Sequence, residues 1–160
     1  MLLNPSSPDT APEMTPIRDA APRVGIEFQP AEARTEAEID AALHRLSSLR
    51  VDAVLVGADP FYMDRRKEIA QQAARLGLPA IYPFREFVTA GGLLSYGTSI
   101  SETIGRAGQY AARILKGAQP SELPVQQPTT FHLVVNGPAA KALGISVPAT
   151  LLARADEVIE

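Results

Sequence analysis

Short apolar runs and segments with helical periodicity follow one another along the chain. The apolar runs are typical of strands and lie at residues 1–3, 24–28, 51–57, 80–82 and 93–96. Segments in which apolar residues recur every three or four positions lie at 36–49, 63–76 and 101–116. This alternation of strands and helices through about residue 97 predicts an α/β fold built on a parallel sheet.

Several local signals fix the expected ends of these elements. Thr35 and Glu38 have the spacing of a capping box, so the first clear helix begins at residue 36. Residues 51–57 are almost continuously apolar, which predicts a strand buried on both faces of the sheet. Gly77 and Pro79 close the helix at 63–76. By contrast, Pro16 makes residues 9–22 a poor helix.

The last third of the chain is less regular. Prolines punctuate a loop at 118–128, and a strand is expected at 131–135. A short helix follows between Pro138 and Gly144. A helical turn near residues 151–154 and a small strand at 157–159 complete the expected elements.

Composition narrows the possible functions. The chain has 160 residues, of which 46% are hydrophobic, so it is long enough for a globular domain with a core. A net charge of −3 argues against a nucleic-acid partner. There is no cysteine, and no apolar run approaches the roughly 18 residues of a membrane span. Asn4-Pro5 interrupts the apolar start, so the chain as given has no signal peptide and is expected to remain cytoplasmic.

The carboxyl ends of parallel strands are where open α/β sheets bind ligands, and these ends carry polar and aromatic side chains here. The candidate ligand-binding residues are Asn4, Ser6, Ser7, Asp59 and Tyr96. They suit a small polar or zwitterionic solute with an apolar part. The serines could hold a carboxylate or only cap a helix, and Asp59 could pair with an ammonium group or cap the helix after Pro60. Tyr96 could stack on the ligand or complete a core.

Other residues favour structural roles. Arg85 is read as a solvated or ion-paired side chain, and Tyr82 and Phe84 as core aromatics. His44 and His132 have no second ligand at metal spacing, so no metal and no cofactor are expected. Phosphate-loop, dinucleotide and nucleophile-elbow motifs are absent, and we expect no catalysis.

An ordered set of segments resembles the tryptophan-binding-like group of ABC-transporter substrate-binding proteins. The segments are VDAVLVGADPFY at 51–62, AIYPFREFVTAGGLLSYG at 80–97, ARILKG at 112–117, LPVQQPTTFHLVVN at 123–136 and AKALGISVPATLLARADEVIE at 140–160. LLNPSSPDT, at residues 2–10, resembles the loop after the first strand of that family's second lobe.

The resemblance implies a type I periplasmic-binding fold, in which two α/β lobes close on a small solute such as an amino acid and dock on an ABC permease. Residues 1–98 would be the second lobe, and 99–160 would be crossover and C-terminal elements belonging to a missing first, N-terminal lobe. The resemblance also places Ser6, Ser7 and Asp59 where relatives hold the ligand's carboxylate and amino groups, and it implies a periplasmic location. The chain would then be a fragment. A ligand-sensing regulatory lobe and a small flavodoxin-like enzyme are the alternatives.

Overall fold

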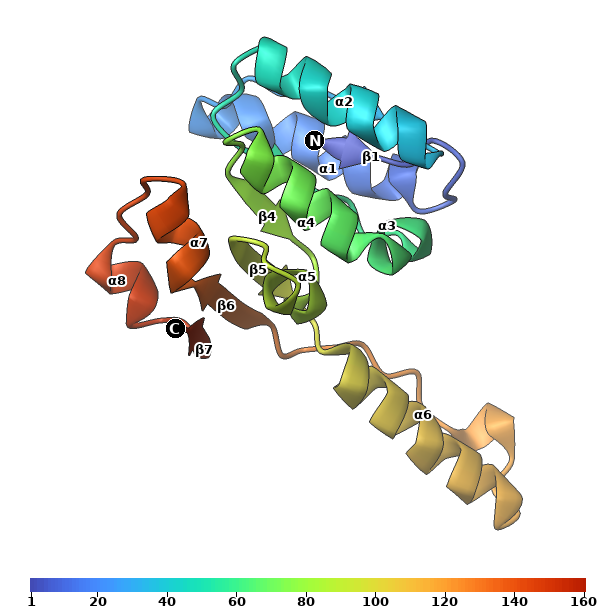
Figure 1. Cartoon of the computed structure of the whole chain (residues 1–160). Helices are drawn as coiled ribbons and strands as arrows, with labels where there is room; N and C mark the ends of the chain where they lie inside the picture. The colour runs from blue at the N-terminus through green and yellow to red at the C-terminus, as the bar shows by residue number, and fades with distance from the viewer.

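Seven short strands form the centre of the computed structural model, which describes all residues 1–160 (Figure 1). The strands are β1 (Leu2–Leu3), β2 (Ala31–Glu32), β3 (Val54–Leu55), β4 (Ala80–Tyr82), β5 (Leu94–Gly97), β6 (His132–Asn136) and β7 (Glu157–Ile159). β1 pairs with β2, and β3 to β7 form a five-stranded sheet in chain order. A parallel bridge between Leu2 and Val56 places β1 beside β3, so the two sheets adjoin.

Every pairing among the strands of residues 1–97 is parallel, which confirms the predicted α/β architecture. β6 is the exception, because it pairs with β5 antiparallel, with Leu94 opposite Val135. β7 then pairs with β6 in parallel. Both strands from the 99–160 segment therefore extend the sheet formed by β3 to β5, and the division of the chain into lobes at residue 98 stays a prediction.

Eight α-helices surround or leave this sheet. They are α1 (Thr10–Ala20), α2 (Glu36–Ser48), α3 (Pro60–Asp64), α4 (Arg66–Arg75), α5 (Arg85–Thr89), α6 (Ile100–Leu115), α7 (Gly137–Ala142) and α8 (Ala149–Leu152). The predicted cap of α2 is confirmed, since the Thr35 side chain accepts a hydrogen bond from the Glu38 amide. The helix buries one apolar face that includes Leu43 and Leu46.

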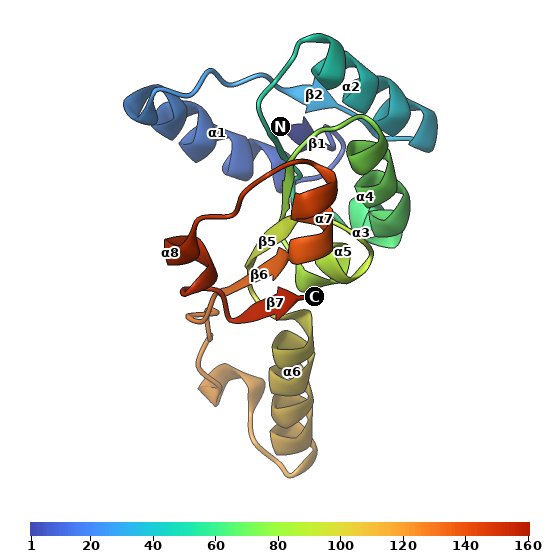
Figure 2. The ribbon, with the colours of Figure 1, turned by 60° about the vertical axis from the view of Figure 1, so that its left-hand side comes forward.

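The main core lies on one face of the sheet. Val54, Ala80 and Tyr82 point into it and pack against α2, α3 and α4. Their neighbours Leu55 and Ile81 point the other way and are 36% and 38% exposed. The prediction that residues 51–57 are buried on both faces was therefore wrong. Its physical reason is that α1, on the opposite face from α2 and α4, has no buried residue and leaves that face thinly covered (Figure 2).

Two predicted elements differ from the structure. Residues 24–28 do not form a strand, because the backbone turns through a 3₁₀ segment at Ala21–Val24 and a left-handed Gly25. The partner of β1 is instead β2, where the Ala31 amide bonds to the Met1 carbonyl at 2.8 Å. The helix expected at 63–76 is divided into α3 and α4, since Arg65 leaves helical geometry with ψ of 20°.

Helix α6 projects away from the rest of the molecule, and the chain returns alongside it to β6 (Figures 1 and 2). None of its residues is buried, and Ile104 and Leu115 are 66% and 88% exposed. Hence its apolar stripe, which the sequence pattern predicted, has little to pack against in this chain.

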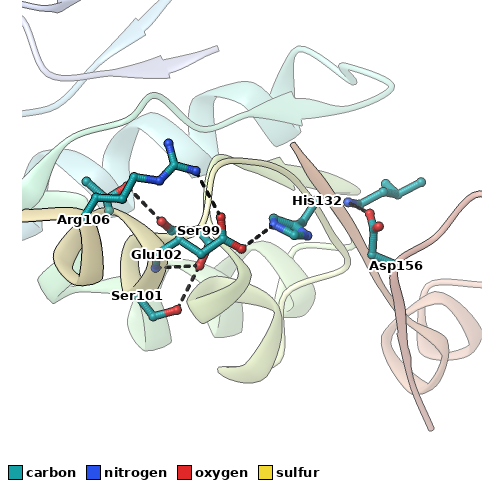
Figure 3. Close-up of polar contacts among 8 residues, drawn as sticks. Ser99, Ser101, Glu102, Arg106, His132 and Asp156 are labelled. Carbon is teal, nitrogen blue, oxygen red and sulfur yellow. Dashed lines mark hydrogen bonds and ion pairs between the residues drawn. The ribbon is translucent and has the colours of Figure 1, made fainter. Parts of the chain in front are cut away.

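A polar cluster ties the base of α6 to the strand that returns from it (Figure 3). The carboxylate of Glu102 lies 3.2 Å from Nε2 of His132 and 3.6 Å from Nη2 of Arg106. Ser99 caps α6 by accepting a hydrogen bond from the Glu102 amide. His132 thus links β6 to α6 through its contact with Glu102.

Candidate functional site

The carboxyl ends of β1 and β3 lie side by side. The Gly57 amide donates to the carbonyl of Leu2 at 2.9 Å, which holds the two strand ends together. A side chain at Gly57 would have little room, because a Cβ atom there would lie 3.3 Å from the Leu2 carbonyl oxygen. The loops that begin at Asn4 and at Gly57 therefore leave the sheet at one edge, as the parallel topology requires.

Asn4 and Asp59 meet at this edge. Nδ2 of Asn4 donates to Oδ2 of Asp59 at 3.2 Å, although 55 positions separate the two residues. Asp59 is 7% exposed, and its other oxygen, Oδ1, accepts hydrogen bonds from the amides of Phe61 (2.9 Å) and Tyr62 (3.3 Å). The carboxylate therefore caps α3, and these donors fix its orientation before any ligand arrives.

Asn4 also organises the loop that carries the two candidate serines. Its Oδ1 accepts from the Ser6 amide at 3.0 Å, and its carbonyl accepts from the Ser7 amide at 3.1 Å and from the Thr10 hydroxyl. The Ser7 hydroxyl in turn accepts from the Asp9 amide at 3.4 Å. The structure thus links Ser6 and Ser7 to Asn4, and only Asn4 among them contacts Asp59. Contact of the serines with a ligand stays a prediction.

Glu13 is an acidic neighbour of this edge that sequence reasoning missed. Its Oε2 would lie 3.2 Å from a Cβ atom built on Gly57, so the carboxylate sits against the β3 end. Partial burial raises the pKa of Glu13, the backbone of Ala58 opposes this by hydrogen bonding, and the charges of Asp9 and Asp59 add to the rise. The only signal was a carboxylate inside the segment 9–22, for which Pro16 predicted a poor helix.

Tyr96 lies apart from the Asn4–Asp59 pair, because β4 separates its strand β5 from β3. Tyr96 is 60% exposed, and its ring stacks on Phe131 with 5.8 Å between ring centroids. Tyr82, which was expected from the sequence to be a core aromatic, is buried and stacks on Phe87 with 4.9 Å between ring centroids. The role of Tyr96 as a ligand contact stays a prediction.

Arg85 forms an ion pair rather than facing the site. Its Nε and Nη2 donate to the two carboxylate oxygens of Glu157 at 2.6 and 2.7 Å. This bidentate pair raises the pKa of Arg85 and lowers the pKa of Glu157, with the hydrogen bonds as the main cause. It joins α5 to β7, which sequence reasoning could not foresee because 72 positions separate the residues.

No group of three or more His, Asp or Glu side chains is arranged to hold a metal ion. No helix is long and apolar enough to cross a membrane. The polar groups of Asn4 and Asp59 at the sheet edge are hydrogen-bond donors and acceptors.

Comparison with solved structures gives the same architecture. A conserved domain protein from Vibrio cholerae superposes with a TM-score of 0.89 at 25% identity, over 98% of this chain and 53% of the other. A Streptococcus pneumoniae ABC domain in complex with L-Trp gives 0.87 at 24% identity, over 99% and 55%. A substrate binding protein with adhesive properties from Clostridium difficile, in a ligand-free open form, gives 0.70 at 21%, over 99% and 52%. The chain spans about half the length of each of these proteins.

The mostly parallel sheet, with polar residues at the carboxyl ends of its strands, gives the chain an α/β fold of the periplasmic-binding type. The sequence model of the ABC transporter substrate binding proteins matches residues 1–159. The chain belongs to this family, and the resemblance noted in its sequence is confirmed. A comparison with curated protein sequences gives no significant match.

Proposed function

We propose that this chain is one lobe of a solute-binding protein that holds a small amino compound, such as an amino acid, for an ABC importer. The observation that carries the proposal is the contact between Asn4 and Asp59 at the carboxyl ends of β1 and β3. Asp59 presents a fixed negative charge to a solute ammonium group, and Glu13 adds a second carboxylate beside it. The bound L-Trp of the Streptococcus pneumoniae neighbour supports a solute of this class.

A second lobe would complete the site and cover exposed surface. A compact monomer of this mass, 17.1 kDa, exposes roughly 7,750 Å². This chain exposes 10036 Å², which is about 30% more than that expectation. Helix α6 contributes to this surface, since none of its residues is buried and its apolar Ile104 and Leu115 are 66% and 88% exposed. We therefore propose that the chain is part of a two-lobe protein, consistent with its covering about half of each neighbour.

Delivery to a membrane permease and a periplasmic location belong to the same proposal. Both rest on the family to which the chain belongs. In such a protein, closure of two lobes would surround the solute, and binding pockets bury about 70–90% of a small ligand's surface. One lobe supplies about half of these contacts, so we expect the 160-residue chain alone to bind amino acids with a Kd of about 0.1 mM or weaker.

Calorimetric titration with the common amino acids tests the proposal. It would compare the chain with a version extended upstream in the same reading frame, and the extended version should bind at least one amino acid far more tightly. In that version Asp59→Asn keeps a capping oxygen but removes the charge, and should weaken binding about ten- to a hundredfold. The matched control is Asp64→Asn, which changes an exposed carboxylate at the end of α3. This variant should bind the amino acid with the same affinity as the parent protein.

Micromolar binding by the 160-residue chain would refute the two-lobe proposal. Equal affinities of Asp59→Asn and the parent protein would refute the role of the Asn4–Asp59 edge. Far-UV circular dichroism of each variant separates a lost contact from a lost fold.

A further inference from the structure

A cavity of about 270 Å³ is lined by residues of α4, β4 and α7. Ten of its fourteen lining residues are hydrophobic, and none carries a charge. Alanines supply much of the wall, among them Ala73 on α4 and Ala139 on α7. The cavity is separate from the sheet edge where Asn4 and Asp59 meet, since neither of these residues lines it.

The connection between β4 and β5 explains why this space is open. Parallel strands are usually joined through a helix long enough to cover the sheet. Here the joining helix, α5, has only five residues and ends before Gly91 and Gly92. A side chain at Gly92 is excluded, because its Cβ would lie 2.6 Å from the Tyr82 ring and 2.8 Å from the Phe87 carbonyl. Gly92 therefore contributes no side chain to the wall of the cavity.

Tyr82 brings an unpaired hydroxyl to this apolar space. The residue is 1% exposed and lines the cavity, yet its hydroxyl makes no hydrogen bond within the protein. Tyr62 is equally buried, but its hydroxyl donates to the Ala33 carbonyl at 2.7 Å. No fully enclosed polar side-chain atom lacks a partner, so the Tyr82 hydroxyl is not fully enclosed. The cavity is an open space that Tyr82 lines. Burial raises the pKa of Tyr82, so the hydroxyl stays neutral and can both donate and accept.

We propose that this cavity is a second ligand site, for a small neutral molecule with an apolar ring and one hydrogen-bonding group that pairs with the Tyr82 hydroxyl. The volume of about 270 Å³ lies just below the usual range of roughly 300–1,000 Å³ for ligand pockets, which favours one ring or two fused rings. A zwitterionic amino acid does not suit it, because burying its charges without a charged partner is costly. The site is therefore chemically distinct from the solute edge.

Titration with indole and with phenol, followed by ¹H–¹⁵N NMR of the 160-residue chain, tests this site. We expect saturable shifts at the amides of Gly91, Gly92 and Ala139, all of which line the cavity. Tyr82→Phe removes only the hydroxyl, and loss of one hydrogen bond should weaken binding about fivefold. It should leave the fold intact, since the hydroxyl has no partner in the protein.

A filling variant and two controls complete the experiment. Ala142→Leu places a larger side chain at the exposed rim of the cavity and should abolish the shifts. Gln71→Leu, an exposed position of α4 outside the cavity, and Asp59→Asn, at the solute edge, should both preserve indole binding. Shifts that do not saturate, shifts that map elsewhere, or equal affinities of Tyr82→Phe and the parent chain would overturn the proposal. Loss of indole binding in Asp59→Asn would also overturn it, by showing a shared site.

Discussion

Gly97 ends β5 against the backbone of Pro83, and Gly97→Ala should be strongly destabilising. A Cβ atom at this position would lie 1.9 Å from the Pro83 carbonyl oxygen and 3.0 Å from its carbonyl carbon. Real Cβ contacts are essentially never shorter than 3.0 Å. The backbone at Gly97 would therefore have to move away from the segment after β4 until the Pro83 carbonyl oxygen lay at least that far from the new Cβ atom. The obstacle is backbone rather than a flexible side chain, and the adjoining β4–β5 pairs, such as Tyr82 with Ser95, oppose the movement.

Overpacking of this kind costs about 1–3 kcal/mol, and a backbone obstacle puts Gly97→Ala near the upper end. For a chain of this size we expect Tm to fall by roughly 6–12 °C. Thermal unfolding followed by far-UV circular dichroism measures the change. The matched control is Gly105→Ala, on exposed α6, where an added Cβ meets nothing within 4 Å. That variant should be unchanged or more stable by up to about 1 kcal/mol. Equal stabilities of Gly97→Ala and the parent chain would refute the close approach of the strand ends.

Three further changes probe other parts of the fold. Thr35→Ala removes the acceptor of the Glu38 amide and should cost about 1 kcal/mol in urea unfolding, whereas an unchanged midpoint would deny the cap a role. Leu43→Ala empties a fully buried position of α2 and should cost about 2–5 kcal/mol by the same assay; a loss below 1 kcal/mol would contradict its place in the core. Glu157→Gln should cost less than about 1 kcal/mol at pH 7, because the Arg85 pair is partly exposed. The lowered pKa of Glu157 means that the pair stabilises the fold above the unfolded value of 4.5 and loses this effect as pH falls through the lower folded value. The two proteins should therefore become equally stable near pH 2, and a difference that persists there would contradict this assignment.

Local residue patterns determined most of the elements. The strand at 80–82 occurs with the predicted ends, because apolar runs and the glycines and prolines around them act over a few residues. The Thr35 cap fixed the start of α2 for the same reason. Parallel order followed from the alternation itself, since parallel strands need a long connection between them.

Competition between segments decided what the pattern could not. Residues 24–28 and 31–32 are both available to pair beside β1, and the chain uses the second, where Ala31 and Ala33 become buried. An apolar run likewise does not reveal how many faces of its strand are covered by helices. For this reason Leu55 was expected to be buried, whereas it is 36% exposed in the structure. Burial depends on which helices come to rest on the sheet, and α1 covers little of it.

The candidate site, too, was predicted only in part from the sequence. The sequence alone named Asn4, Ser6, Ser7 and Asp59, because polar residues after buried strands in an α/β pattern collect at one edge. Only the tertiary structure showed that Asn4 and Asp59 touch, that Glu13 joins them and that Tyr96 lies apart. These contacts join residues far apart in the chain, so they depend on strand order and helix placement. Local sequence fixes the type of each element, whereas the packing of distant elements fixes which side chains meet.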